Sequence, residues 1–162
     1  GVDVPLSAVA DAARIGIATL YRNFPTRDDL IRAVVEDLAD CFRAVEDDYL
    51  TRIDKDPDQG WHDFVHALAA LRPGTLIPAL AEKFGDTGTP DYVEPLRTGV
   101  LAAQETLLER AKDAGLVRDD VSAKNFQLGI ASITRPLSEQ DEADCDTHTS
   151  GLIDVYLRGL RP

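Results

Sequence analysis

Apolar residues recur every three or four positions along most of the chain, and this period is typical of helices packed on one side. The clearest case runs from Leu30 to Ile53, where the apolar residues fall on one face of a single long helix. Runs that alternate between apolar and polar residues, which would indicate strands, are nearly absent. The pattern therefore predicts an all-α fold.

Prolines, glycines and capping residues divide this pattern into separate helices. Pro25 ends a short helix, Thr26 followed by two aspartates is a typical helix start, and Gly115 is a typical helix end. We expect polar breaks at residues 54–60 and 85–91, and a loop over the acidic residues 138–148. The predicted helices span residues 7–13, 17–24, 26–53, 61–71, 76–84, 93–114, 122–133 and 149–160.

The first two predicted helices are short, lie about three residues apart and precede a long capped helix, as in a helix-turn-helix unit. Such a pair is either a simple packing corner or a unit whose second helix enters the major groove of DNA. Leu20 and Phe24 lie one turn apart and can face inward. The second helix then leaves outside the donors that suit phosphate oxygens: Thr19, Tyr21, Arg22 and Asn23.

The charge distribution agrees with DNA binding at the amino-terminal end only. The whole chain carries a formal net charge of -12, which would repel nucleic acid. Residues 1–35, however, hold four arginines and four aspartates, so the entire negative charge lies after residue 35. This favours the DNA-binding interpretation of the second short helix over the packing corner.

The segment LSAVADAARIGIATLYRNFPTRDDLIRAV, from Leu6 to Val34, resembles the DNA-binding segment of the TetR family of transcriptional regulators, of the AcrR type. The family signature is T-[LY]-Y-x-[HN]-F-P-[ST]-[KR]. The rest of the chain resembles the family in its layout of helices. The residues that match the signature are Thr19, Leu20, Tyr21, Asn23, Phe24, Pro25, Thr26 and Arg27.

The resemblance implies two domains, a helix-turn-helix DNA-binding domain at 1–35 and a ligand-binding and dimerisation domain at 36–162. The family's first helix would precede Gly1, so the DNA-binding domain is expected to be partial. Arg14 stands where the family commonly has a turn glycine. By the family pattern, bases would face Ile17, Ala18 and Tyr21, and phosphates would be held by Thr19, Asn23 and Arg27.

The expected function is that of a homodimeric transcriptional regulator, usually a repressor, released from a double-stranded DNA operator by a small-molecule effector. No enzyme activity, metal or cofactor is expected. No apolar run predicts a membrane span and no amino-terminal pattern predicts export. Cys41 and Cys145 are too few and too far apart for a disulfide framework, so we expect a cytoplasmic protein without a membrane partner.

Large apolar residues after residue 60 are candidates for the lining of an effector cavity, although such residues are also typical of a plain core. They favour an apolar or aromatic effector, which His66 and Tyr92 would orient through hydrogen bonds. The candidate ligand-binding residues are Trp61, Phe64, His66, Leu68, Phe84, Tyr92 and Leu107.

The last two predicted helices carry apolar stripes that a lone subunit would expose, and they predict a four-helix dimer interface. The stripes contain Phe126, Ile130, Ile133, Leu152, Val155 and Tyr156.

The sequence HDFVH, with His62, Asp63 and His66, is close to the H-E-x-x-H zinc pattern and is the main indication of another function. Aspartate is shorter than the glutamate of that pattern, and the only other histidine, His148, lies far along the chain. A helical metal-dependent hydrolase is therefore a less favoured alternative. A helical protein-interaction module is another.

Overall fold

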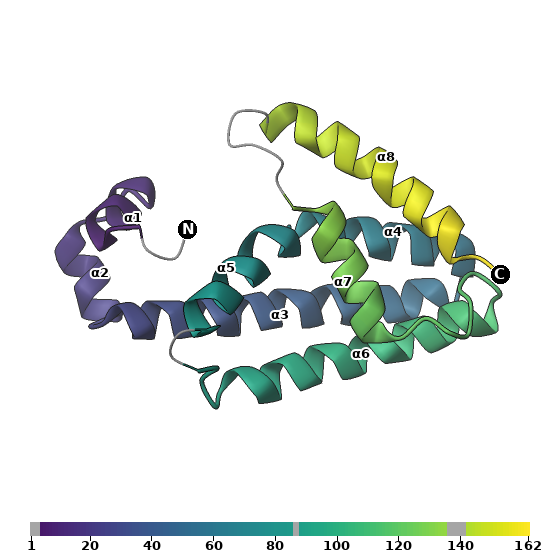
Figure 1. Cartoon of the computed structure of the whole chain (residues 1–162), viewed down its shortest axis with the longest axis horizontal. Helices are drawn as coiled ribbons and strands as arrows, with labels where there is room; N and C mark the ends of the chain where they lie inside the picture. The colour runs from purple at the N-terminus through teal and green to yellow at the C-terminus, as the bar shows by residue number, and fades with distance from the viewer. Residues whose placement is uncertain (1–3, 86–87, 136–141) are drawn as a thin grey trace.

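The computed structural model describes residues 4–85, 88–135 and 142–162, and within these ranges the chain forms eight helices and no strand (Figure 1). This confirms the all-α fold predicted from the spacing of apolar residues. The helices are α1 Leu6–Ala12, α2 Ile17–Asn23, α3 Arg27–Ile53, α4 Pro57–Ala70, α5 Pro73–Gly85, α6 Val93–Asp113, α7 Ala123–Ile133 and α8 Glu142–Leu160.

The 27-residue helix α3 runs through the whole molecule and joins its two parts (Figure 1). Its start is fixed by a capping box, in which the backbone N–H of Asp29 donates to Thr26 Oγ1 and the backbone N–H of Thr26 donates to Asp29 Oδ2. The pair α1–α2 lies beyond this start, while α4 and α6 pack along the rest of α3. One continuous helix thus connects the amino-terminal unit to the body.

The body is closed by a large core in which three aromatic rings meet. The ring centroids of Trp61 and Phe126 are 5.2 Å apart, and those of Trp61 and Phe64 are 5.6 Å apart. Helix α8 packs on α4, and α5 packs on α7. Gly74 permits that second contact, because a Cβ there would lie 2.1 Å from the backbone oxygen of Ala131.

Two helix starts differ from the prediction. Helix α4 begins at Pro57, inside the expected polar break, because Asp56 accepts a hydrogen bond from the backbone N–H of Gln59 and proline suits the first helical position. Helix α8 begins at Glu142, inside the expected acidic loop. Carboxylates are favourable at a helix amino terminus, so an acidic segment is compatible with a helix start. Residues 138–141 of that loop, and the side chain of Cys145, lie outside the described residues.

Two other helix boundaries confirm the predicted caps. Gly115 has a φ of 71°, and the backbone N–H of Leu116 donates to the oxygen of Ala111, which closes α6 as expected for a Schellman motif. Ser122 Oγ accepts from the backbone N–H of Asn125 at the start of α7. Local capping chemistry therefore sets both ends of the α6–α7 connection.

A helix that spans a membrane must be long and apolar, and the described helices do not meet both conditions. No single one of them is long and apolar enough to cross a bilayer. Helices α4 and α5 satisfy the length and composition test only as a pair bent by 49°, and their apolar residues pack in the core.

A buried carboxyl group lies in the contact between α3 and α6. Glu46 is fully buried and Gln104 faces it, yet neither side chain has a hydrogen-bond partner of ordinary geometry among the described residues. Burial raises the pKa of Glu46 to about 8, and the facing Gln104 amide offsets only part of this effect. Glu46 is therefore held mainly in its neutral form below that pH.

We expect Glu46→Gln to remove a pH dependence of stability. Between pH 4.5 and about 8 the folded protein keeps a proton on Glu46 that the unfolded chain releases, so the free energy of unfolding falls as the pH rises through this window. The slope contributed is at most about 1.4 kcal/mol per pH unit. Urea unfolding at several pH values should show the fall in the parent and not in the variant. Glu109→Gln, on the exposed side of α6, should behave like the parent, and equal slopes in the parent and Glu46→Gln would contradict the assignment.

Candidate functional site

The helix-turn-helix unit is held together by a tight turn and two buried residues. Ala10 of α1 and Leu20 of α2 are buried, and they are the only buried residues of these two helices. In the turn, Arg14 has a φ of 54°, which is the left-handed conformation that favours glycine. This explains why the family commonly has glycine at the position of Arg14.

The outer face of α2 carries the residues expected to meet DNA bases. Ile17, Ala18 and Tyr21 are all exposed, with Tyr21 half accessible to solvent. Ile17 and Tyr21 thus present an apolar and an aromatic side chain on the surface of α2. Arg14 and Arg22 are exposed on the same unit and supply positive charge.

The residues expected to hold phosphates make contacts within the protein. Asn23 Nδ2 donates to the backbone oxygen of Thr19 at 3.0 Å. Arg27 Nη2 donates to the backbone oxygen of Val4 at 2.8 Å, so this guanidinium ties the segment before α1 to the start of α3. Arg27 therefore has a structural role within the helix-turn-helix unit, separate from any contact with DNA.

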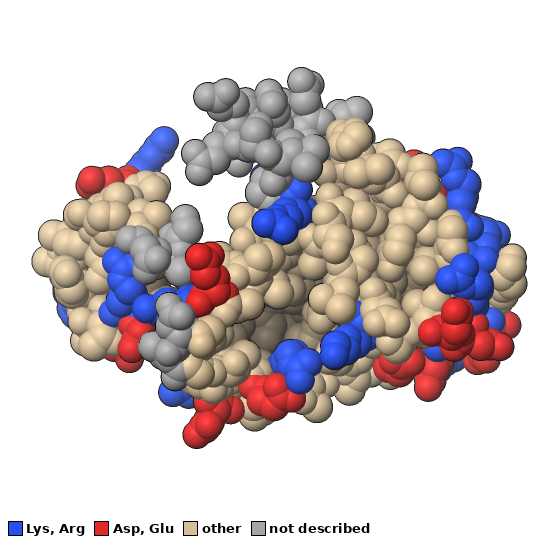
Figure 2. Space-filling model, viewed as in Figure 1, with Lys and Arg blue, Asp and Glu red and all other residues tan. Residues whose placement is uncertain are grey.

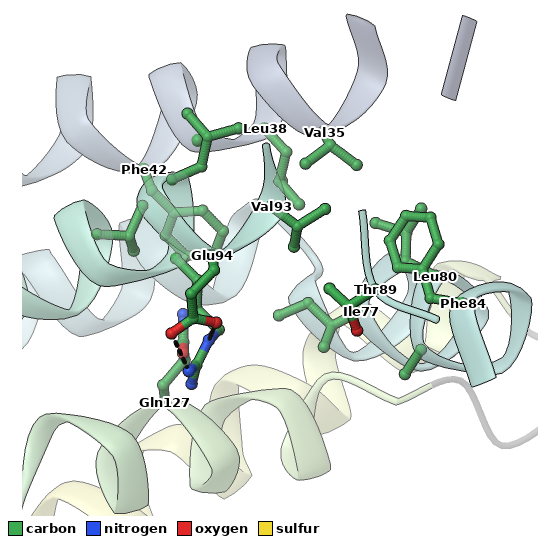
Figure 3. A pocket seen from close by; sticks show the side chains of 15 residues that line it. Val35, Leu38, Phe42, Ile77, Leu80, Phe84, Thr89, Val93, Glu94 and Gln127 are labelled. Carbon is green, nitrogen blue, oxygen red and sulfur yellow. Dashed lines mark hydrogen bonds and ion pairs between the residues drawn. The ribbon is translucent and has the colours of Figure 1, made fainter. Parts of the chain in front are cut away.

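A cavity of about 420 Å³, a size that suits a small ligand, opens between α3, α5 and α6. Figure 2 shows its mouth as a hollow in the middle of the face drawn, and Figure 3 shows the side chains that line it. Its wall is mainly apolar and includes Val35, Leu38 and Phe42 of α3, Ile77, Leu80 and Phe84 of α5, and Val93, Leu96 and Val100 of α6.

The polar groups of this cavity are few and come mainly from α6 and α7. Glu94 and Arg97 form an ion pair, with Arg97 Nη2 2.7 Å from Glu94 Oε1 (Figure 3). Gln127 of α7 and Thr89 add an amide and a hydroxyl to the lining. An apolar wall with a few polar groups is the usual composition of a small-molecule site.

The cavity wall also includes the contact between the first part of α3 and α5. Val35, Leu80 and Phe84 line the cavity and, with Ile31, make a small hydrophobic cluster separate from the main core. Beside this cluster the guanidinium of Arg32 lies over the ring of Tyr92, 5.1 Å from its centroid. A ligand in the cavity would touch the residues that hold the first turns of α3.

Only Phe84 of the seven predicted ligand-binding residues lines this cavity. Tyr92 lies beside it in the small cluster, and His66 bonds to Asp154 on the far side of α4. The other four occupy the main core, because their rings and branched chains fill the contact of α4 with α6 and α7: Trp61, Phe64, Leu68 and Leu107. Aromatic residues did not indicate the position of the cavity. The better indication is the apolar face of the long helix, on which Val35, Leu38 and Phe42 recur at helical spacing.

The apolar stripes of the last two helices also divide differently than expected. Phe126 and Ile130 are buried in the subunit's own core, because α7 lies between α5 and α8. Among the described side chains of these helices, the exposed large apolar ones are Leu128, at 54%, Leu152, at 37%, and Val155, at 57%. These three residues are therefore the candidates for an exposed apolar surface on α7 and α8.

In the folded chain, the two histidines of HDFVH lie beside a carboxylate that the sequence did not predict as their neighbour. His66 Nε2 lies 3.0 Å from Asp154 Oδ1 of α8, and His62 Nε2 lies 3.4 Å from the same oxygen. The remaining histidine, His148, is exposed on α8. Asp154 lies 88 positions after His66, so no local sequence pattern could predict this contact.

Comparison with known proteins agrees with both parts of the molecule. Residues 56–162 match the family model for the C-terminal domain of SbtR-like transcriptional regulators of the TetR type. The structure resembles the crystal structure of TetR transcriptional regulator SCO0520 from Streptomyces coelicolor, with a TM-score of 0.70, 26% sequence identity, and coverage of 100% of this chain and 90% of that chain. No curated protein matches the chain. The fold and the family model, together with the residues of α2, show that this chain belongs to the TetR family of transcriptional regulators.

Proposed function

We propose that the protein is a ligand-responsive regulator that binds a double-stranded DNA operator as a homodimer and is released from it by a small molecule. The observation that carries this proposal is the double use of Val35, Leu80 and Phe84, which line the cavity and also join the first part of α3 to α5. Repression of the genes beside the operator, in the cytoplasm, is the outcome expected for such a regulator. The division at residue 35 falls within α3, so the two proposed domains share one helix.

DNA binding is proposed to use the outer face of α2. Ile17, Ala18 and Tyr21 would lie along base edges, where apolar side chains contact thymine methyl groups. Thr19, Asn23 and Arg27 would meet phosphates, with Arg22 as a further cation. Two such helices in a symmetric dimer would read two half-sites about one turn of DNA apart.

Release is proposed to proceed through α3. A ligand that prefers one arrangement of the cavity wall shifts the protein toward that arrangement by its difference in affinity for the two states. Val35 lies eight residues after Arg27, about 12 Å along the helix axis. A change in the packing of the cavity wall would thus alter the orientation of α2 at the start of α3. The effector is proposed to be mainly apolar, with one polar group that meets Arg97, Glu94 or Gln127.

The dimer is proposed to form through the exposed apolar residues of α7 and α8. Helices α7 and α8 lie very close together at Gly129 and Tyr156, since a Cβ on Gly129 would lie 2.3 Å from Tyr156 Oη. The exposed residues Leu128 and Val155 directly precede these two residues in the sequence. Association with a second copy would cover both side chains. A symmetric pairing of α7 and α8 gives four helices at the interface.

DNA binding is the first test of this proposal. In the full-length protein, Arg22→Ala should reduce the slope of log affinity against log salt by about one per subunit, because one phosphate contact is lost. Ala18→Glu should abolish binding by placing a carboxylate in the groove. Arg52→Ala, at the far end of α3 and paired with Asp48, should change neither property. Absence of affinity for any duplex in a randomised pool, without ligand and at low salt, would refute the regulator function.

The cavity can be tested by filling it. We expect apolar or aromatic compounds to raise the melting temperature of the parent, since they bind only the folded state. Ile77→Trp, on the cavity wall, should lose this response, whereas Thr106→Trp, on the exposed side of α6, should keep it. Equal thermal shifts in both variants would place the effector elsewhere.

The dimer interface can be tested by sedimentation. Leu128→Asp together with Val155→Asp should give a monomer with unchanged helical circular dichroism, because both side chains are exposed within the subunit. Val34→Asp, an exposed apolar residue of α3, is the matched control and should remain dimeric. A double variant that still sediments as a dimer rules this surface out.

A further inference from the structure

A cluster of metal-ligand side chains lies between α4 and α8, outside the cavity and the DNA-binding unit. His62 and His66 are one turn apart on α4, and Asp154 reaches them from α8. One ligand atom from each of the three residues lies within 4.8 Å of the other two. The cluster joins α4 to α8, and its residues His66 and Asp154 are 88 positions apart in the sequence.

The orientation of His62 is that of a ligand with a supporting partner. Its Nδ1 lies 3.2 Å from Asp63 Oδ1, and the Nε2 of Gln59 donates to that same oxygen at 2.7 Å. When Nδ1–H donates to Asp63, the Nε2 of His62 carries a lone pair and lies 3.4 Å from Asp154 Oδ1. A lone pair and a carboxylate oxygen this close repel each other unless a proton or a metal ion lies between them. Metal-binding histidines commonly have such a carboxylate on the other ring nitrogen.

The spacing fits a small tetrahedral ion. Bonds of about 2.0–2.2 Å to imidazole nitrogen and carboxylate oxygen place neighbouring ligand atoms about 3.3 Å apart. The two Nε2 atoms lie 3.0 Å and 3.4 Å from Asp154 Oδ1, so small side-chain shifts would admit an ion. Two imidazoles with one carboxylate favour Zn²⁺ or a similar transition ion over Mg²⁺.

The surroundings leave room for a fourth ligand. All three side chains are partly exposed, and His62 and Asp154 also line a cavity of about 230 Å³. Arg161 in that cavity is paired with Asp58 at 2.8 Å, which offsets its charge. Arg158 lies one turn after Asp154 and favours a water, hydroxide or anion as the fourth ligand.

We propose that His62, His66 and Asp154 bind one Zn²⁺ ion per chain and that this ion fastens α8 to α4. The site stands independently of the DNA-binding function, since none of its residues belongs to α2 or to the larger cavity. The alternative is a hydrogen-bonded cluster that takes no ion, and the two can be separated by direct binding measurements.

The experiment uses the full chain without a histidine tag, freed of metal by a chelator and dialysed. Calorimetric titration with Zn²⁺ and metal analysis should give one ion per chain. The melting temperature should rise by about 5–10 °C when free Zn²⁺ exceeds the dissociation constant about 100-fold, and Mg²⁺ should cause no rise. His66→Ala and Asp154→Asn should lose at least about 100-fold in affinity, whereas His148→Ala, the remaining histidine, should bind like the parent.

Asp63→Asn is the finer test, because it leaves all three ligands in place. It should weaken Zn²⁺ binding by about 10- to 100-fold with unchanged stoichiometry. Circular dichroism of each variant before metal addition establishes that it is folded. A folded parent without micromolar affinity for Zn²⁺, an equal loss in His148→Ala, or one ion per two chains would overturn the proposal.

Discussion

The mutual hydrogen bonds of Thr26 and Asp29 fix where α3 begins, and the rest of the molecule depends on that point. Because α3 is one helix from Arg27 to Ile53, its first residue sets the rotation of every later one about the helix axis. Val35, Leu38 and Phe42 then face the cavity, and Phe24 and Pro25 turn the chain from α2 toward α3 just before the cap. A shift of one residue in the cap would rotate the cavity wall by about 100° relative to α2.

The two hydrophobic clusters differ greatly in size, and this difference fits a two-part molecule. The main core joins α3, α4, α6, α7 and α8, whereas only four buried residues hold the start of α3 against α5. Local stability follows the amount of buried apolar contact, so the contact at the smaller cluster rearranges at lower cost than the main core. The cavity lies directly on it, through Val35, Leu80 and Phe84.

The sequence predicted what depends on neighbouring residues and missed what depends on distant ones. The starts of α3 and α7 and the end of α6 follow from Thr26, Ser122 and Gly115, whose capping bonds span a few residues. The start of α4 was missed although Asp56 and Pro57 signal it, because the polar residues around them suggested a loop.

The candidate sites show the same limit. The spacing of Phe126 and Ile130 indicates an apolar face, but only the packing of α7 between α5 and α8 shows that this face is internal. The exposure of Ile17 and Tyr21 on α2 could be predicted because their motif is contiguous. Asp154 and the cavity lining could not, since α3, α5, α6 and α8 bring them together from separate parts of the chain.

Helix α7 has little freedom to move within the subunit. A Cβ on Gly74 would collide with the backbone of α7 near Ala131, and a Cβ on Gly129 would collide with Tyr156 of α8. Helices α5 and α8 therefore pack tightly against α7 on two sides. Gln127 lines the cavity and Leu128, the next residue, lies on the exposed apolar surface. In a dimer built on that surface, whatever displaces Gln127 also presses on the partner subunit. Occupancy of one cavity would then change the affinity of the other, so the two subunits would not respond to effector independently.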